Sequence, residues 1–226
     1  MLDTLLLSRG SLVRGSRRRS SSHISQALPS FLTAPSRWIA REKAKAFLLA
    51  TVADTGRGLE GGNRAAVETA VDELAACGRE DVEAGSAPPV SILSGTWKLL
   101  WTSERETLFL LEKGLFNVGP ARDVFQVLDA AARTLSNVVE FGETEMSAAF
   151  VVKGTLRPES DVRCSFAFKR VELQRADGST FGVAPPFGSG FFDTVYCDDT
   201  LRVSRDSRGD TLIVSRERVP WPRPRK

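Results

Sequence analysis

Histidine is almost absent from this chain: His23 is the only one among 226 residues. It lies in an N-terminal segment whose composition sets it apart from the folded domain. Without another histidine, that domain lacks the residues for Ser-His-Asp or Cys-His catalysis and for a histidine-ligated metal site. The nucleophile-elbow, phosphate-loop and dinucleotide-binding glycine motifs are missing as well. The sequence therefore predicts a protein that is not an enzyme and that uses no metal ion or cofactor.

Cysteine is scarce too, and long apolar runs are missing. Cys77, Cys164 and Cys197 are widely spaced and form no Cys-x-x-Cys pair, which argues against a disulfide scaffold and against a zinc site. We expect them to be small buried residues, although a disulfide in an oxidised compartment stays open. No apolar run approaches the ~20 residues that a membrane-spanning helix needs.

The net charge of +3 is concentrated at the front of the chain. Residues 1–36 contain five arginines and one aspartate, so this segment carries +4 and the remainder −1. A near-neutral remainder lacks the basic surface of a nucleic-acid-binding protein. The Ser- and Arg-rich segment 1–36 is typical of an organelle transit peptide, with a disordered basic tail as the alternative. Composition alone does not distinguish a chloroplast address from a mitochondrial one.

Residues 37–90 are predicted to be a helical hairpin followed by a linker. The two helices span about 36–54 and 64–77, where apolar residues recur at helical spacing. Asn63 and Gly78 are expected to cap the start and the end of the second helix. We expect the hairpin to cover one end of a sheet and to carry no chemistry.

The segment 94–103 (SGTWKLLWTS) is predicted to be the first strand. Trp97, Leu99 and Trp101 alternate with other residues, and a period of two indicates a half-buried strand. Two tryptophans on one inner face are a large apolar load for a single strand. This strand therefore marks the change from helical to extended structure along the chain.

Residues 91–217 are predicted to form about seven strands joined by short turns. No helix separates successive strands, which favours an antiparallel meander or barrel over a parallel α/β sheet. Within residues 162–173 the inward phase slips at Lys169-Arg170, as a β-bulge would produce. The predicted fold class is mainly β, an antiparallel β-barrel preceded by an α-helical hairpin.

Three segments are predicted to lie outside the strands. Residues 104–119 contain an apolar patch and are expected to form a short helix or a loop over the barrel mouth. Residues 181–190 are a Pro- and Gly-rich loop. Residues 218–226 are basic and Pro-rich, and we expect a disordered tail.

The inward faces of the predicted strands carry large apolar side chains. Such side chains fill a small barrel, whereas a slightly wider barrel holds an apolar ligand, so both interpretations stay open. Small neighbours such as Ala148, Ala149 and Ala167 would leave room and favour a cavity. The candidate ligand-binding residues of the barrel interior are Trp101, Phe125, Phe150, Phe166 and Phe168.

A carboxylate cluster, Asp193, Asp198 and Asp199, lies close in sequence to Tyr196 and Arg202. Paired carboxylates can act as acid and base or bind a hard cation. Carboxylates at strand ends more often cap turns and pair with neighbouring arginines, which here would be Arg202 or Arg205. We favour the structural interpretation.

Three segments of the chain resemble the plastid lipid-associated proteins, also called plastid fibrillins. These segments are SGTWKLLWTS at 94–103, the strands at 125–129 and 137–140, and GFFDTVYCDDTLRVSR at 190–205. The resemblance covers about residues 36–217, and it departs from the family at Trp101 and Cys197 without affecting the fold. The matching signature positions, whose role in the family looks structural, are Gly95, Trp97, Asp193, Tyr196, Asp199, Leu201 and Arg202.

The resemblance implies a lipocalin-like β-barrel in the chloroplast, at plastoglobules or thylakoids or in the stroma. In lipocalin-like barrels an arginine of a late strand stacks on the tryptophan of the first strand. Arg216 shares its predicted inward face with Leu212 and Val214, so we expect Arg216 to pack on Trp97. Trp97 then belongs to the barrel floor, and any ligand lies further up, near Phe150.

Three functions follow, in order of preference. The first is non-catalytic: the protein binds apolar lipids or isoprenoids, or coats plastoglobules and thylakoid membranes. The second is a scaffold that docks a plastid lipid- or quinone-biosynthetic enzyme. The third, an enzyme that uses Asp193 and Asp199, stands well behind both. The expected partners are thus an apolar lipid, a membrane or lipid-droplet surface, or a biosynthetic enzyme, and not a nucleic acid.

Overall fold

The computed structural model describes residues 30–83, 90–114, 119–142, 148–175, 177, 179–183 and 188–222. The predicted transit segment, residues 1–36, therefore lies almost entirely outside the described residues. Residues 115–118, 184–187 and 223–226, which belong to the two predicted loops and the predicted tail, lie outside them as well. Within the described ranges, no helix combines the length and the apolar character needed to cross a membrane.

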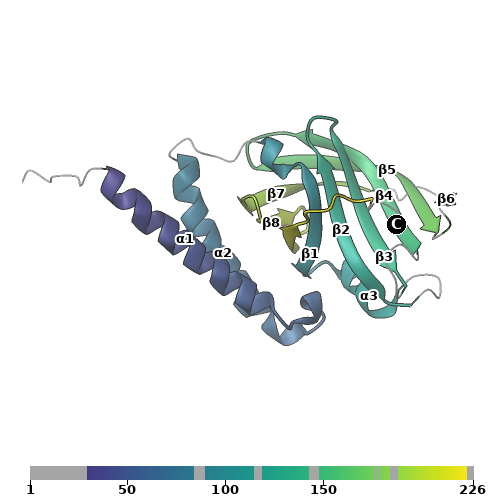
Figure 1. Cartoon of the computed structure of the whole chain (residues 1–226), viewed down its shortest axis with the longest axis horizontal. Helices are drawn as coiled ribbons and strands as arrows, with labels where there is room; N and C mark the ends of the chain where they lie inside the picture. The colour runs from purple at the N-terminus through teal and green to yellow at the C-terminus, as the bar shows by residue number, and fades with distance from the viewer. Residues whose placement is uncertain are drawn as a thin grey trace, which may run out of the picture.

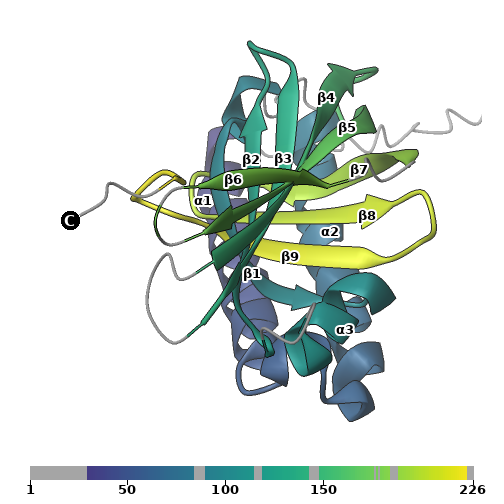
Figure 2. The same ribbon diagram turned by 90° about the vertical axis from the view of Figure 1, so that its right-hand side faces the viewer.

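Nine antiparallel strands form one ring-like sheet (Figure 1). The strand order is β4-β3-β2-β1-β9-β8-β7-β5-β6, and a further pairing of β4 with β5 joins the two sides of the sheet. Figure 2 shows β7, β8 and β9 side by side. The prediction of a mainly β, antiparallel fold is confirmed. The strands are β1 (Gly95–Thr102), β2 (Ala121–Asp129), β3 (Thr134–Phe141), β4 (Ala148–Pro158), β5 (Arg163–Arg175), β6 (Thr180–Val183), β7 (Ser189–Cys197), β8 (Leu201–Asp206) and β9 (Thr211–Arg216).

β6 occupies part of the segment that was expected to be a Pro- and Gly-rich loop. β7 pairs with β5 only at residues 163–167. The later part of β5 therefore has a free edge, and β6 pairs with it at residues 171–174. Unpaired N–H and C=O groups along a strand edge favour the addition of a further strand. The pairing of β6 thus adds one strand that the sequence pattern does not predict.

The predicted β-bulge in β5 is confirmed. Lys153 of β4 pairs with Arg170, and the next residue, Gly154, pairs with Phe168, so Lys169 is the extra residue. A Cβ atom on Gly154 would lie 2.6 Å from the carbonyl oxygen of the facing strand. A glycine is therefore required where the two strands approach so closely.

A second bulge, which the sequence pattern does not reveal, lies in β1. The register between β1 and β9 shifts between Leu99 and Trp101, which makes Leu100 the extra residue. An extra residue reverses the face to which the following side chains point. Trp97 and Leu99 belong to the core inside the ring, whereas Trp101 belongs to a separate core outside it. The prediction that Trp101 lines the interior is therefore wrong.

The helices α1 (Ser30–Val52) and α2 (Arg64–Glu83) pack on the outer face of the ring, and not over one end of it as predicted (Figure 1). Two short 3-10 turns, η1 (Gly56–Gly58) and η2 (Gly61–Asn63), connect them. Apolar side chains of both helices meet the face that carries Trp101. The buried residues of this outer core are Leu48, Val52, Val67, Ala70, Val71, Leu74, Trp101, Tyr196, Leu201, Val203 and Ile213.

The end of α2 differs from the prediction. The helix continues through Gly78 to Glu83, so Gly78 does not terminate it. One glycine inside a helix costs only about 1 kcal/mol relative to alanine, which the residues on either side can offset. Asn63 lies in η2, and its Nδ2 donates to the carbonyl oxygen of Thr51, 3.2 Å away, a bond that links the two helices.

Ion pairs connect the helical hairpin to the sheet at β8 and at the turn before it. Lys45 of α1 donates from Nζ to Oδ2 of Asp198, 2.5 Å away, at the turn between β7 and β8. Arg205 of β8 contacts two carboxylates of α2, with Nη2 at 3.1 Å from Glu68 and at 2.8 Å from Asp72. These contacts fix the direction in which the apolar faces of the helices meet the sheet.

One end of the ring is closed by Arg216 and the 3-10 turn η3 (Val90–Leu93). The Arg216 guanidinium lies 4.1 Å from the centroid of the Trp97 ring, which confirms the predicted contact. Its Nη1 donates to the carbonyl oxygen of Ser94 at 2.7 Å, and its Nη2 donates to that of Ile92. The Trp97 indole donates from Nε1 to the carbonyl oxygen of Leu93 at 2.8 Å. A cation, an indole and the η3 carbonyls thus form the floor of the ring.

The C-terminal segment is ordered as far as it is described, contrary to the prediction of a disordered tail over residues 218–226. Trp221 is buried on the outer face of β2, β3 and β4, where it packs with Phe125, Val138, Ala149 and Val151. Its backbone N–H donates to Oγ1 of Thr96 at 3.0 Å. The segment therefore covers an apolar face that would otherwise meet solvent.

We predict that Asp198→Asn destabilises the protein at neutral pH by about 2 kcal/mol, because hydrogen bonds to a charged carboxylate are lost. Burial opposes ionisation of Asp198, but hydrogen bonds from Lys45, Tyr196 and two backbone N–H groups outweigh it and hold the pKa well below its usual range. This stabilisation is fully present above the unfolded-state pKa of about 3.9 and is lost as the pH falls towards the lower folded pKa. Denaturant unfolding from pH 7 to about pH 2 should therefore show the wild type and the variant converging at acid pH. A constant gap would contradict this, and the exposed Asp161→Asn is the control.

We also predict that Arg216→Met destabilises the protein by about 2–3 kcal/mol, because the cation–π contact and the hydrogen bonds to backbone carbonyls are lost.

The position of Gly95 should not accept a side chain, because its φ is 143° and a Cβ atom on this residue would lie 2.5 Å from the Arg216 guanidinium. Gly95→Ala is therefore expected to destabilise the protein as well. Thermal unfolding of both variants, with the exposed Arg157→Met as control, measures the effect. An unchanged midpoint in Arg216→Met would show that the floor contacts contribute nothing.

Candidate functional site

The ring encloses a cavity beneath the short helix α3 (Arg105–Lys113). This first cavity has a volume of about 320 Å³. A second cavity of about 520 Å³ shares Glu104, Gln126, Asn137 and Phe168 with it. The apolar wall of the first cavity comes from six strands and consists of Leu99, Val124, Val139, Phe150, Val152, Phe168, Leu212 and Val214.

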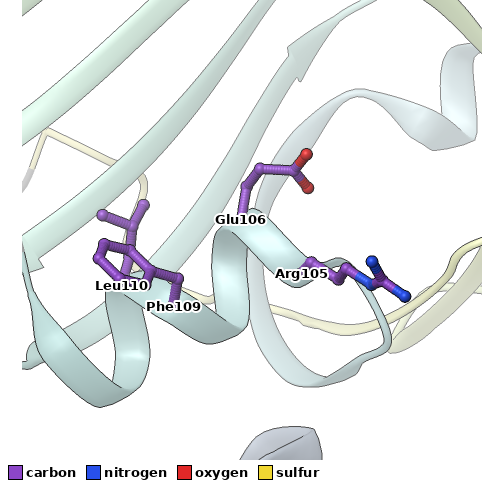
Figure 3. Close-up of a pocket in the computed structure, with 4 residues that line it drawn as sticks. All are labelled: Arg105, Glu106, Phe109 and Leu110. Atoms are coloured by element: carbon purple, nitrogen blue, oxygen red, sulfur yellow. The ribbon is translucent and has the colours of Figure 1, made fainter.

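α3 lies over the mouth of these cavities, as the short-helix alternative for residues 104–119 predicts. Glu106 and Leu110 line the first cavity, whereas Phe109 is 56% exposed. Figure 3 shows Phe109 and Leu110 together on one side of the helix, with Glu106 pointing away from them. These residues and Arg105 also line a shallow surface hollow. The mouth is therefore flanked by an exposed apolar side chain and by charged ones.

Four of the five predicted interior residues line the cavities, and three of these four pack against the interior core. Phe150 borders the first cavity, Phe166 the second, and Phe168 both. The rings of Phe166 and Phe168 lie with their centroids 5.1 Å apart. Both rings come from β5, and Phe150 comes from the neighbouring strand β4, so one side of the interior is aromatic.

Phe125 is placed differently from the prediction. Although it borders the first cavity, it is buried in the outer core under Trp221. Val124 packs against the interior core, and Gln126 lines both cavities, so the inward residues of β2 are those on either side of Phe125. The sequence pattern misleads here because the inward position holds a polar glutamine and the outward position an aromatic ring.

Polar residues inside the ring were not identified from the sequence. Gln126 of β2 donates from Nε2 to Oδ1 of Asn137 on β3, 3.0 Å away. Arg202 of β8 donates from Nη2 to Oε1 of Gln126. Since β9 and β1 lie between β8 and β2, the Arg202 side chain reaches across the interior of the ring. The period of two along β8 allows Arg202 to face inward, but its charge favours a prediction of the outer face.

Arg202 is completely buried, with an exposed fraction of 0%. Its guanidinium lies 5.4 Å from the ring centroid of Trp97 and 5.5 Å from that of Phe192. Nε and Nη1 are buried and have no hydrogen-bond partner within the described ranges of the chain. Burial lowers the pKa of Arg202 to about 10, so the group remains a cation at neutral pH.

The predicted carboxylate cluster does not converge on one site. Asp193 forms a bidentate pair with Arg163, with both N···O distances at 2.7 Å. Asp198 binds Lys45 and the Tyr196 hydroxyl, whereas the side chain of Asp199 takes no part in this network. In the parts of the chain that are described, no group of acidic, cysteine or histidine residues is arranged to hold a metal ion. These contacts agree with a structural role for the aspartates, although the arginine that pairs with Asp193 is Arg163 and not Arg202 or Arg205.

The cysteines are free thiols without features of a reactive site. Burial raises the pKa of Cys164, and it raises that of Cys197 to about 11. Both thiols are therefore protonated at neutral pH, and a thiol is a much weaker nucleophile than a thiolate.

Comparison with known proteins agrees with these features. The family model described as PAP_fibrillin matches residues 42–215. The chain is 36% identical over 186 residues to the probable plastid-lipid-associated protein 11, chloroplastic, of Arabidopsis thaliana, across 80% of this chain and 82% of that protein. No solved structure matches the chain. The chain therefore belongs to the PAP_fibrillin family of plastid-lipid-associated proteins and is a chloroplast protein.

Proposed function

We propose that this protein binds one apolar lipid or isoprenoid molecule inside the ring and acts without catalysis. The observation that carries the proposal is the cavity of about 320 Å³ beneath α3, whose wall is mostly aliphatic and aromatic. Ligand cavities in proteins typically have volumes of about 300–1,000 Å³ and predominantly apolar walls. The first cavity and its larger neighbour together suit a single chain better than a lipid with several chains.

The ring is best understood as a lipocalin-like barrel with one closed and one open end. Arg216 and Trp97 close the floor, as expected for that architecture. α3 lies over the opposite side, where it borders both cavities through Glu106 and Thr107. A ligand would therefore enter past α3, whose movement would open the mouth.

Contact with a lipid surface, such as a plastoglobule or a thylakoid membrane, would use the exposed side of α3. Phe109 is 56% exposed beside Leu110, at the entrance through which a ligand would pass (Figure 3). An aromatic side chain that inserts into a lipid surface would bring the mouth of the cavity to the source of the ligand. Binding and coating are then two aspects of one function.

A scaffold that docks a plastid biosynthetic enzyme is the second candidate. The observation that favours it is the exposed apolar residues of α1, which the ring does not cover. They are Trp38, Ile39, Phe47 and Leu49, with exposed fractions of 58%, 46%, 53% and 38%. Several large exposed apolar residues on one helix can mark an interaction surface. Loss of enzyme binding, with lipid binding intact, in a Trp38→Ser variant would support the scaffold.

We predict that Val152→Trp weakens lipid binding at least about tenfold, because the indole fills the space that the ligand needs and overpacking costs about 1–3 kcal/mol. Val152 borders the first cavity. The measurement is the dissociation constant of a fluorescent apolar probe, together with mass spectrometry of the lipid retained by the purified protein.

The matched control is Val127→Trp, because Val127 packs in the outer core with Phe125 and Trp221. It makes the same chemical change outside the cavity and should bind the probe as the wild type does. Equal affinity in Val152→Trp and the wild type would overturn the proposal, and so would a wild-type protein that retains no lipid and binds no probe.

A further inference from the structure

Arg202 is a buried cation whose hydrogen-bonding capacity is largely unused. A guanidinium has five N–H donors, and three of them belong to Nε and Nη1. Among the described residues, neither of these buried nitrogens has a partner, whereas Nη2 donates to Gln126. In the described part of the chain, no carboxylate forms an ion pair with Arg202.

Such an arrangement is unfavourable unless another molecule completes it. Removing a charge from water is costly, and the cost is recovered only when the buried group is paired and hydrogen-bonded. The rings of Trp97 and Phe192 stabilise the guanidinium from their faces. Aromatic faces, however, offer no acceptor to the N–H groups at the guanidinium edge. The unused donors therefore point to an acceptor that the chain itself does not supply.

Arg202 adjoins the cavities through the residues that surround it. Gln126, its hydrogen-bond partner, lines both cavities, as does Asn137. Phe192 and Ser204, which is on the same face of β8, line the second cavity. A ligand that extends from the cavity past Gln126 would thus meet the guanidinium at the floor.

The charges around the mouth have the opposite sign. Glu104, Glu106 and Asp206 line the second cavity on this side, together with Arg208, whose guanidinium pairs with Glu106 and Asp206. An anionic head group is disfavoured at the mouth and favoured at the floor, which sets the direction in which a ligand enters.

We propose that the carboxylate of a single-chain, fatty-acid-type lipid binds Arg202 at the floor of the ring, with its apolar chain directed towards α3. Gln126 and Asn137 supply further polar contacts beside the head group. A carboxylate accepts two parallel N–H bonds from one guanidinium, a geometry that neutral lipid oxygens do not match. This inference rests on the proposed function, since it names the class of lipid that the interior cavity takes.

The test compares cis-parinaric acid with its methyl ester, two fluorescent probes that share one chain and differ in the charge of the head group. We expect the full chain to bind the acid at least about tenfold more tightly than the ester at neutral pH, as a charge-assisted hydrogen-bond pair provides. In Arg202→Met this preference should disappear while the ester still binds with its wild-type affinity. Arg163→Met is the matched control, because Arg163 is stacked on Phe191 at 3.9 Å and paired with Asp193 away from the cavities.

The outcomes separate the two proposals. Equal binding of acid and ester by the wild type, or a preference that survives in Arg202→Met, would overturn the role of Arg202 and leave lipid binding in place. Binding of neither probe would overturn lipid binding, and the role of Arg202 with it. If Arg202→Met does not fold, the wild-type comparison decides alone: the preference for the acid must disappear when the pH falls below the pKa of the probe carboxyl group.

Discussion

The extra residue in β1, Leu100, allows one strand to serve two hydrophobic cores. Before the bulge, Trp97 points into the ring, where it meets Arg216 and forms the floor. After it, Trp101 points outward and becomes the centre of the surface on which α1 and α2 pack. Without this change of face, both indoles would crowd the interior and the helical hairpin would lose an aromatic side chain of its core. The enclosed cavity therefore depends on the same bulge that attaches the helices.

The interior that results is apolar along its walls and polar at a few defined points. The aliphatic and aromatic side chains leave a space of about 320 Å³ under α3. A network from Arg202 through Gln126 to Asn137 runs across the floor side of that space. A buried cation of this kind reduces the stability of the empty protein. Its retention is reasonable where a ligand with an acceptor group occupies the interior.

Part of this architecture could be predicted from the sequence. Alternation located most strands, the bulge in β5 and the contact of Arg216 with Trp97, because these follow from local periodicity or from the family resemblance. The faces of Trp101 and Phe125 could not be predicted: a large apolar side chain fits either core, and the sequence does not reveal a bulge at Leu100. Arg202 was missed as an interior residue for a related reason, since charged residues in strands normally face solvent. The pairing of β6 and the burial of Trp221 depend on long-range contacts that no local pattern encodes.

The central claim is that the ring holds one lipid molecule in its interior. The most direct measurement is a crystal structure of the full chain with a bound long-chain fatty acid. The account predicts continuous density for the chain between Leu99, Phe150 and Phe168, with the carboxylate beside Arg202. Density confined to the outer surface, along α1 or over Phe109, with side chains closing the interior space, would contradict it.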